Sequence, residues 1–313
     1  MNKKLIIRIS NELGNQMFMY AAAYSISKKL DRKLYIDNET AFLSKKNISK
    51  YGLGNFDISS KTANKEDKFL GLRGYLRKKI FKFISNISKK KIFFVEPKNS
   101  EKITCYNDDI YNQILSKNHY IEGYFESEKY FKDIKNEILK EFTFINSDIF
   151  KKTPHYIKLN LANSVSICLR QDRFIEGKGK NNPQNKLKSE QFRDEQINYI
   201  NKSINYIKKT VENPTFYLWS NDLSNVDMSL FNAEIQQITH TQDSIFDLDN
   251  RALDLFLISQ CNHHIVIPSS FNWWGAWLCV KKDKIICRPD ADFFSFFKVN
   301  NLDFWPSHWI KIS

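Results

Sequence analysis

The sequence predicts an α/β protein made of two Rossmann-like domains that face each other with a cleft between them. Stretches rich in apolar residues alternate with amphipathic stretches along the whole chain, which is the pattern of parallel βαβ units. The 313 residues suffice for about two domains at roughly 150 residues each. The βαβ series starts twice, each time with a strand that runs into a polar turn. We therefore expect a ligand at the carboxyl ends of the strands.

The first domain is expected over residues 1–155. The apolar stretch "LIIRIS" predicts its first strand, "AAAYSISKKL" continues a helix, and "KLYID" predicts the next strand. Further strands are expected at "KIFFVE" and "HYIEGYF". A helix is expected over residues 127–142, with Ser127 as its N-cap.

The second domain is expected over residues 156–313 and starts with the strand "SVSICLR". Residues 176–190 are rich in Gly, Lys and Asn without apolar periodicity, and they predict a loop. A long helix follows in "DEQINYINKSINYIKKTV". The strands "TFYLWSND", "HHIVIPSS" and "KIICRP" then alternate with the helices "RALDLFLISQC" and "NWWGAWLCV".

Composition narrows the function classes. The five cysteines form no CxxC pair, which argues against a disulfide framework or a zinc site and favours a cytoplasmic, reducing environment. The net charge of +13 fits nucleic acid, an anionic membrane surface or a lysine-rich solvated surface. Nucleic acid is the weakest of the three because no binding motif accompanies the charge. Residues 68–94 alternate basic and apolar residues at helical spacing, which is typical of a membrane-surface helix or of an ordinary packed helix.

Two stretches of the second half carry candidate chemistry. Arg170, Asp172 and Arg173 follow an apolar strand, where an arginine fork can bind phosphate oxygens, although a strand-end salt bridge is the plainer alternative. Ser269, Ser270 and Phe271 lie between a strand and a helix, a position whose backbone N–H groups favour anions.

The polar turn after the first strand carries Gly14, Asn15 and Gln16. It lacks the glycine spacing and the lysine of a phosphate-binding loop, so it is a poor phosphate cradle. A close backbone approach at Gly14 and the two side-chain amides would suit sugar hydroxyls or a diphosphate. The alternative is that Asn15 and Gln16 only cap the helix.

Three stretches together resemble the bacterial α-1,2-fucosyltransferases of glycosyltransferase family 11. They are "NELGNQMFMYA", "GYFESEKYF" and "SSFNWW", which occur in the family's order and span nearly the whole chain. The sequence departs from the family's His-x-Arg-Arg-x-Asp motif. Arg170 matches the first Arg of the motif, but Cys168 replaces its His and Gln171 replaces its second Arg. Asn11 and Glu12 stand where the family has two glycines.

The resemblance implies a GT-B type fold and inverting, metal-independent transfer of fucose from GDP-fucose to the 2-hydroxyl of a galactoside in an O-antigen type glycan. No cofactor is then expected. Arg170 would bind the diphosphate together with Ser269 and Ser270, Asp254 would accept hydrogen bonds from guanine, and Arg173 is a candidate for the second Arg. In a GT-B protein the first domain takes the acceptor and the second domain the donor.

Some alternatives stay open. The base that takes the acceptor proton is Asp172, Glu12 or Glu126, or the reaction has no dedicated base. Another GT-B glycosyltransferase that uses a different nucleotide sugar fits the same motifs. The basic segment over residues 68–94 suits peripheral contact with the inner face of the cytoplasmic membrane, near a lipid-linked acceptor.

Overall fold

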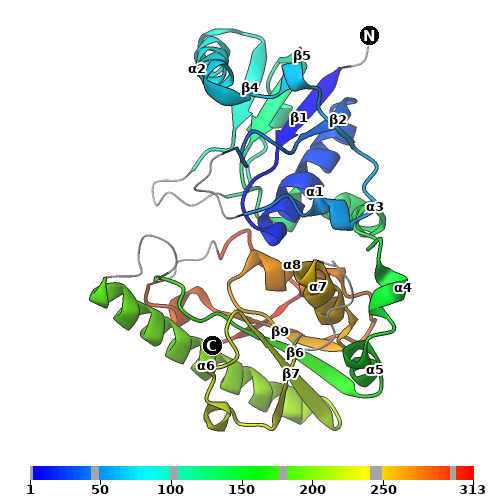
Figure 1. Cartoon of the computed structure of the whole chain (residues 1–313), viewed down its shortest axis with the longest axis vertical. Coiled ribbons are helices and arrows are strands. Elements are labelled where there is room, and N and C mark those ends of the chain that lie inside the picture. Colours follow the sequence, from blue (N-terminus) through cyan, green and yellow to red (C-terminus); the bar gives the residue numbers. More distant parts are fainter. Residues whose placement is uncertain (1–2, 44–48, 99–104, 176–181, 240–248, 297–300) are drawn as a thin grey trace. The chain divides into compact units, whose positions relative to one another are not determined.

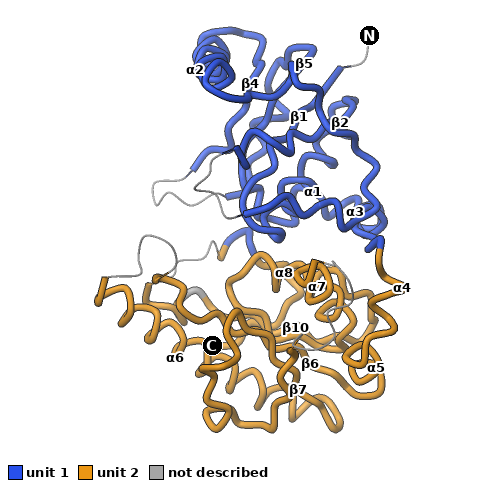
Figure 2. Tube along the Cα trace, viewed as in Figure 1, with its two compact units in different colours: residues 1–145, 302–304 blue, residues 146–301, 305–313 orange. Residues whose placement is uncertain are grey.

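The computed structural model describes residues 3–43, 49–98, 105–175, 182–239, 249–296 and 301–313. The chain folds into two compact units (Figure 2): unit 1 comprises residues 1–145 and 302–304, and unit 2 comprises residues 146–301 and 305–313. The domain boundary expected at residue 155 falls within α5 (Pro154–Asn160), a helix of unit 2.

Unit 1 is built on a parallel five-stranded sheet in the order β3-β2-β1-β5-β4. Its strands are β1 (Lys4–Arg8), β2 (Lys33–Asp37), β3 (Lys61–Thr62), β4 (Lys91–Val95) and β5 (Leu115–Glu122). Because β1 lies in the centre with β2 and β5 beside it, the turns after these strands leave the sheet at the same edge. This edge is where ligands bind in open parallel sheets.

The helices of unit 1 are α1 (Leu13–Lys29), α2 (Gly71–Ile87) and α3 (Lys135–Glu141). The continuous helix expected over residues 127–142 is wrong in its first half, which forms two short 3-10 turns before α3 begins. Phe131 separates these turns with φ −136° and ψ 5°, a conformation outside the helical region that interrupts the helical path. Ser127 does cap, but it caps the first 3-10 turn, where its hydroxyl accepts from the Lys129 N–H at 3.2 Å.

Helix α2 lies beside the edge strand β4 (Figure 1), and most of its apolar side chains face outward. Leu72 is 76% exposed and Phe83 is 66% exposed, and Leu76, Ile80 and Ile87 are also exposed. Within the helix only Gly74 and Ser85 are buried. The helix expected from the basic segment is therefore present, but its apolar face is not packed onto the sheet of unit 1.

Unit 2 contains a parallel six-stranded sheet in the order β11-β10-β9-β6-β7-β8. Its strands are β6 (Asn163–Leu169), β7 (Pro214–Ser220), β8 (Ile235–Gln237), β9 (His263–Ile265), β10 (Ile286–Pro289) and β11 (Ile310–Ile312). The central strands β6 and β9 are adjacent and almost wholly buried. Apolar side chains alternate in them with small polar and histidine side chains, several of which are buried as well.

The helices of unit 2 are α4 (Ser147–Phe150), α5, α6 (Pro183–Thr210), α7 (Asn250–Gln260) and α8 (Ser270–Leu278). The loop expected over residues 176–190 is wrong from residue 183 onward, and residues 176–181 lie outside the described residues. The Asn182 side chain accepts from the Gln184 N–H at 3.0 Å, and Pro183 occupies the first helical position. These two residues are strong helix-start signals that outweigh the polar composition.

The "NWW" part of the third family-like stretch belongs to the core of unit 2. Trp273, Trp274 and Trp277 on α8 are fully buried, and their rings contact one another with centroids 5.0–6.0 Å apart. Helix α8 packs against α7, where Gly275 lies so close to Ile258 that a Cβ would approach its side chain to 2.3 Å. The two helices are therefore held firmly behind the carboxyl edge of the sheet.

Candidate active site

Two of the predicted donor-binding stretches meet at the carboxyl edge of the sheet in unit 2. Strands β6 and β9 are hydrogen-bonded neighbours, and Ile167 lies opposite Ile265 in their register. Arg170 directly follows β6, and Ser269 directly precedes α8, a few residues beyond β9. The register therefore brings the arginine and the N-terminus of α8 to adjacent places on one edge.

The backbone of Arg170 is clamped by Gln196, a fully buried residue of α6. The Arg170 N–H donates to the Gln196 Oε1 at 3.0 Å, and the Gln196 Nε2 donates to the Arg170 carbonyl at 2.9 Å. A side-chain amide that pairs with both backbone groups of one residue replaces a missing strand neighbour. This pairing fixes the start of the arginine side chain while leaving the residue itself half-buried.

Gln171, which replaces the second arginine of the family motif, has a structural role. It is buried, its N–H donates to Asn221 Oδ1 at 2.7 Å, and its side chain donates to the Asp222 carbonyl. These bonds join the turn after β6 to the turn after β7. Asp172 and Arg173 follow as exposed residues, and Asp172 has a left-handed backbone with φ 56°.

The N-terminus of α8 presents Ser269, Ser270 and Phe271, all of them half-buried. Ser269 occupies the N-cap position, but its hydroxyl makes no capping hydrogen bond. The first N–H groups of a helix have no partner within the helix and carry the positive end of its dipole. This geometry suits an anionic oxygen.

Asp254 lies in α7, one turn after the helix start. Asp249, not Asp254, is the N-cap of α7, and it accepts from the Arg251 N–H at 3.1 Å. Burial raises the pKa of the Cys168 thiol well above its ordinary value, and the charges of Cys261 and Asp254 add to this rise. The Asp254 carboxyl is thus close to the end of β6, and Cys168 is a neutral, buried thiol where the family has a histidine.

The turn after β1 in unit 1 differs from the expectation. The left-handed residue is Asn11, with φ 63°, whereas Gly14 is a buried residue within the first turn of α1. Gln16 is fully buried, and its amide donates to the carbonyls of Asn11 and Lys50 and accepts from the Gly52 N–H, at 2.7–2.8 Å. The expected ligand contact of Gln16 is therefore wrong, because its side chain fastens the turn and the following segment to α1.

The other candidates in unit 1 are Asn15 and Glu12 at the start of α1 and Glu126 after β5. Asn15 is half-buried on α1, and Glu12 is exposed and accepts from the Ser49 hydroxyl at 2.7 Å. Glu126 is half-buried in the turn after β5. None of these three residues lines either of the two cavities of unit 1 described next.

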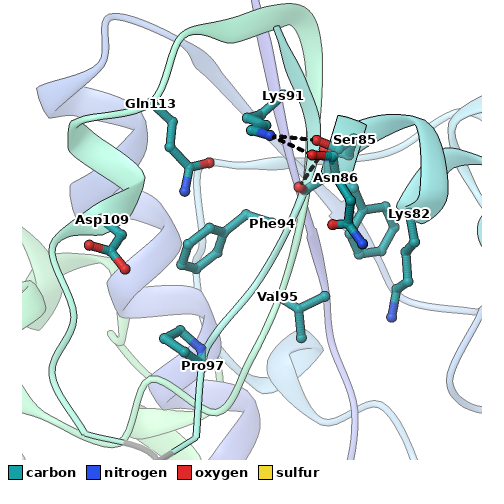
Figure 3. A pocket seen from close by; sticks show the side chains of 10 residues that line it. Lys82, Ser85, Asn86, Lys91, Phe94, Val95, Pro97, Asp109 and Gln113 are labelled. Atoms are coloured by element: carbon teal, nitrogen blue, oxygen red, sulfur yellow. Dashed lines mark hydrogen bonds between the residues drawn. The ribbon is translucent and has the colours of Figure 1, made fainter. Parts of the chain in front are cut away.

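Two cavities of unit 1 are lined by described residues. The larger, of about 620 Å³, lies between α2 and β4, where the Lys91 ammonium donates to the carbonyls of Ser85 and Asn86 (Figure 3). The smaller, of about 240 Å³, lies at the carboxyl ends of β1, β4 and β5 and is lined by Arg8, Glu96 and Glu122 among others. Only the smaller cavity has the position expected of a ligand site in a parallel sheet.

The model of the glycosyl transferase family 11 matches residues 2–313, and this observation decides the family. The chain belongs to glycosyl transferase family 11. It is 27% identical over 314 residues to an α-1,2-colitosyltransferase of Escherichia coli, covering 98% of both chains. It is 26% identical over 298 residues to the O-antigen biosynthesis glycosyltransferase WbnK of Escherichia coli, covering 90% of this chain and 92% of the relative.

Solved structures with a similar fold include fucosyltransferases. The NodZ α-1,6-fucosyltransferase soaked with GDP-fucose matches with a TM-score of 0.51 and 13% identity, over 89% of this chain and 93% of NodZ. A variant of Arabidopsis thaliana FUT1 in complex with GDP matches with a TM-score of 0.53 and 13% identity, over 93% of this chain and 71% of FUT1. The family 11 enzyme thus has an α/β fold of the GT-B type, as its sequence predicts.

The structure also limits what this family 11 glycosyltransferase contains. Among the described residues, no three His, Cys, Asp or Glu side chains gather in a way that would hold a metal ion. In the same part of the chain, no helix combines the length and apolar character needed to cross a membrane.

Glu96 is the residue that the sequence analysis missed. It follows β4 and is buried, and it carries no motif of its own in the sequence. The available signal was indirect: an acidic residue ends the apolar stretch "KIFFVE", at the edge where ligands bind in parallel sheets.

Proposed function

We propose that this glycosyltransferase transfers fucose from GDP-fucose to the 2-hydroxyl of a galactoside in a bacterial surface glycan of the O-antigen type, with inversion at the anomeric carbon. Membership of family 11 supports the transfer of a sugar. The two Escherichia coli relatives support an O-antigen setting and an α-1,2 linkage, because their names contain these terms.

The observation that carries the proposal is the juxtaposition of Arg170 and the N-terminus of α8 at one edge of unit 2. In the reaction the bond between the anomeric carbon and the diphosphate breaks, and its electron pair moves onto a phosphate oxygen. A guanidinium fork and the N–H groups at a helix N-terminus both stabilise that negative charge. The Asp254 carboxylate is suited to accept two N–H groups of a guanine edge.

A donor panel with product linkage analysis tests this function. The purified enzyme is given GDP-fucose, GDP-mannose and UDP-sugars with a galactoside acceptor, and the products are identified by mass spectrometry and methylation analysis. We expect transfer from GDP-fucose onto the 2-position of galactose. Transfer from UDP-sugars alone would contradict the guanine role of Asp254, and a product with another linkage would contradict the acceptor position.

A second candidate function is the transfer of colitose from GDP-colitose. One observation favours it, namely the 27% identity to an α-1,2-colitosyltransferase over nearly the full length of both chains. Including GDP-colitose in the panel separates the two functions. A kcat/KM for GDP-colitose well above that for GDP-fucose would replace the proposed donor while leaving the reaction class unchanged.

We further propose that the reaction needs no metal ion and no cofactor. Charge stabilisation then rests on Arg170 and α8, and Arg173 is the candidate for the second cation because Gln171 is neutral. Excess EDTA is expected to leave the transfer rate unchanged. Complete loss of activity in EDTA, with recovery on adding a divalent ion, would overturn this part of the proposal.

We also propose that α2 holds the enzyme on the inner face of the cytoplasmic membrane, near a lipid-linked acceptor. Support comes from the exposed Leu72, Ile80 and Phe83 and from the exposed basic residues Arg73 and Lys79 on the same helix. Apolar insertion and attraction to anionic headgroups act together in such helices. No nucleic acid partner is proposed.

Vesicle flotation tests this contact. The protein is expected to float with vesicles that contain phosphatidylglycerol and to stay behind with vesicles of phosphatidylcholine alone. The triple change Leu72→Ser, Ile80→Ser and Phe83→Ser should abolish flotation. The matched control is Leu187→Ser, which removes an exposed leucine from α6 in unit 2. Equal flotation of the triple variant would contradict the role of α2.

A further inference from the structure

The smaller cavity of unit 1 has the position and the chemistry of a sugar site. It measures about 240 Å³, which has room for one sugar unit, and it opens at the carboxyl ends of β1, β4 and β5. Arg8, Ser10 and Asn11 line it from the β1 side, and Glu96 and Lys98 line it after β4. These groups donate and accept hydrogen bonds, as sugar hydroxyls require.

Glu96 is held rigidly at this cavity. Its Oε2 accepts from the N–H groups of Tyr124 and Phe125 at 2.7 and 2.9 Å, and its side chain is buried. Its Oε1 receives one long bond, from the Tyr130 hydroxyl at 3.3 Å. Since a carboxylate oxygen can accept two hydrogen bonds, Oε1 keeps the capacity to accept a substrate hydroxyl.

The family-like stretch "GYFESEKYF" supplies the residues that hold the Glu96 carboxylate in place. A Cβ on Gly123 would lie 2.5 Å from the Glu96 Cβ and 2.8 Å from its Oε2, so only glycine lets the carboxylate lie here. Phe125 has a left-handed backbone with φ 53°, which turns two successive N–H groups toward one oxygen. Backbone strain of this kind persists where the surrounding structure enforces it, and it clusters at functional sites.

The neighbouring carboxylate, Glu122, has the opposite environment. It forms ion pairs with Arg8 at 2.8 Å and with Lys78, and it accepts a hydrogen bond from Lys82 at 3.0 Å. Although burial alone would raise its pKa, these cations hold the pKa of Glu122 below its ordinary value. Burial raises the pKa of Glu96 to about 7, and the hydrogen bonds from Phe125, Tyr124 and Tyr130 and the charge of Lys98 only partly oppose it.

Two carboxylates whose surroundings push their pKa values apart are a sign of acid–base function. Glu122 remains ionised and paired, whereas Glu96 can exchange a proton near neutral pH. The other titratable groups that line the cavity are Arg8, Lys98 and Tyr124.

We propose that Glu96 is the general base of the transfer reaction and that the cavity of unit 1 holds the acceptor sugar. The Glu96 carboxylate takes the proton of the attacking hydroxyl while that oxygen bonds to the anomeric carbon of the donor. The bond from the anomeric carbon to the diphosphate breaks, and its electron pair leaves on the phosphate oxygen. This inference rests on the proposed glycosyl transfer and names its acceptor site.

The test is the pH dependence of kcat/KM for the wild type, Glu96→Gln and Tyr130→Phe, with acceptor concentration varied. We expect the wild-type kcat/KM to fall below about pH 7 as the base is protonated. Glu96→Gln should lower kcat by about 10²–10⁴-fold with little change in acceptor KM, and the acid limb should vanish. Tyr130→Phe removes a donor that favours the ionised form, so its acid limb should move to higher pH.

The matched control is Glu141→Gln, a change at another buried carboxylate of unit 1, which bonds to Ser59 and Tyr20 away from the cavity. Its acid limb should match the wild type. A Glu96→Gln variant that keeps near-wild-type kcat and an acid limb overturns the role of Glu96 while the proposed function stands. A wild-type enzyme that transfers no sugar overturns both. If Glu96→Gln does not fold, an unmoved limb in Tyr130→Phe overturns the role of Glu96.

Discussion

The carboxyl edges of the two sheets are built alike but carry opposite chemistry. Both sheets are parallel, and both carry their candidate residues at or just after the carboxyl ends of strands. In unit 2 this edge offers the guanidinium of Arg170 and the N-terminus of α8, which suit a departing anion. In unit 1 it offers the carboxyl of Glu96, which suits a hydroxyl that must lose a proton, beside the ion-paired Glu122. The fold determines which edge of each sheet carries the candidate residues. The side chains at that edge determine whether it suits an anion or a hydroxyl.

Left-handed residues mark these turns in both units. Asn11 follows β1, Phe125 follows β5, and Asp172 follows β6, with φ of 63°, 53° and 56°. A left-handed L-residue costs free energy, and Asn and Asp tolerate it best after Gly. Two further residues with this conformation, Asp31 and Asn213, precede β2 and β7, so it accompanies sharp turns at both edges of the sheets and not at the candidate edges alone.

A large effect is expected from removing the guanidinium of Arg170 in unit 2. We expect Arg170→Ala to lower kcat for sugar transfer by about 10²–10³-fold, because an uncompensated charge then develops on the leaving diphosphate. Arg170→Lys should recover only part of this loss, since an ammonium lacks the planar fork. The measurement is steady-state transfer kinetics with circular dichroism to check the fold.

Arg193→Ala provides the matched control for Arg170. Arg193 is a half-buried arginine of α6 that pairs with Asp194 at 2.9 Å. It should retain wild-type kinetics. Near-wild-type transfer by Arg170→Ala would show that the donor diphosphate is bound elsewhere.

The next effect concerns unit 1 and the pH dependence of stability. The folded-state pKa of Glu96, about 7, lies above its ordinary value of 4.5, so the folded protein binds more protons between these values. Stability should therefore fall as pH rises from about 4.5 through 7, by on the order of 3 kcal/mol from this group. Thermal unfolding of wild type and Glu96→Gln should coincide near pH 4 and diverge above pH 7, where the variant is more stable. A difference in stability between wild type and Glu96→Gln that does not change with pH would contradict the raised pKa of the buried Glu96 carboxyl.

The strands were largely predictable from sequence because buried parallel strands read as short apolar runs, such as "SICL" before Arg170. The start of α6 was not predicted because its first turns are polar, and only Asn182 and Pro183 marked it. At the site, the stretch over residues 123–131 was recognised as family-like, but its role depends on a contact with Glu96, distant in sequence. Such a contact is fixed by the order of β4 and β5 in the sheet, which no local pattern reveals.

Gln16 and Gln171 are two further residues whose roles could not be predicted from the sequence. Both are polar residues in candidate turns, and both use their amides to hold backbone groups of other segments. Composition alone does not separate an amide that faces a ligand from one that satisfies buried backbone groups. The partners lie 34 to 51 positions away in sequence and appear only in the folded chain.

A smaller effect is expected from adding a side chain at Gly123, which packs closely against Glu96. The Cβ of Gly123→Ala would press against the Glu96 side chain and would lie 2.8 Å from the Phe125 ring. We expect a loss of about 1–3 kcal/mol in stability, as for other overpacked sites, together with reduced transfer. The matched control is Gly54→Ala, whose Cβ would meet only the Tyr51 ring, at an ordinary 4.0 Å. Unfolding by denaturant measures both, and equal stability of the two variants would contradict the close packing at Glu96.

The smallest effect is expected from substitutions that separate the role of the backbone conformation from the role of the side chain, at Asn11 in unit 1 and at Asp172 in unit 2. Asn11→Ala places an alanine in the left-handed region and should destabilise unit 1 by about 1 kcal/mol, whereas Asn11→Gly should be nearly neutral or stabilising. Asp172→Ala and Asp172→Gly form the same pair in unit 2. If the glycine variants are as stable as wild type and also as active, the turns need only their conformation. If activity falls in Asn11→Gly while stability holds, the Asn11 side chain contributes to the cavity that it lines. The replacement of the family's glycine by Asn11 would then change the choice of acceptor and not the fold.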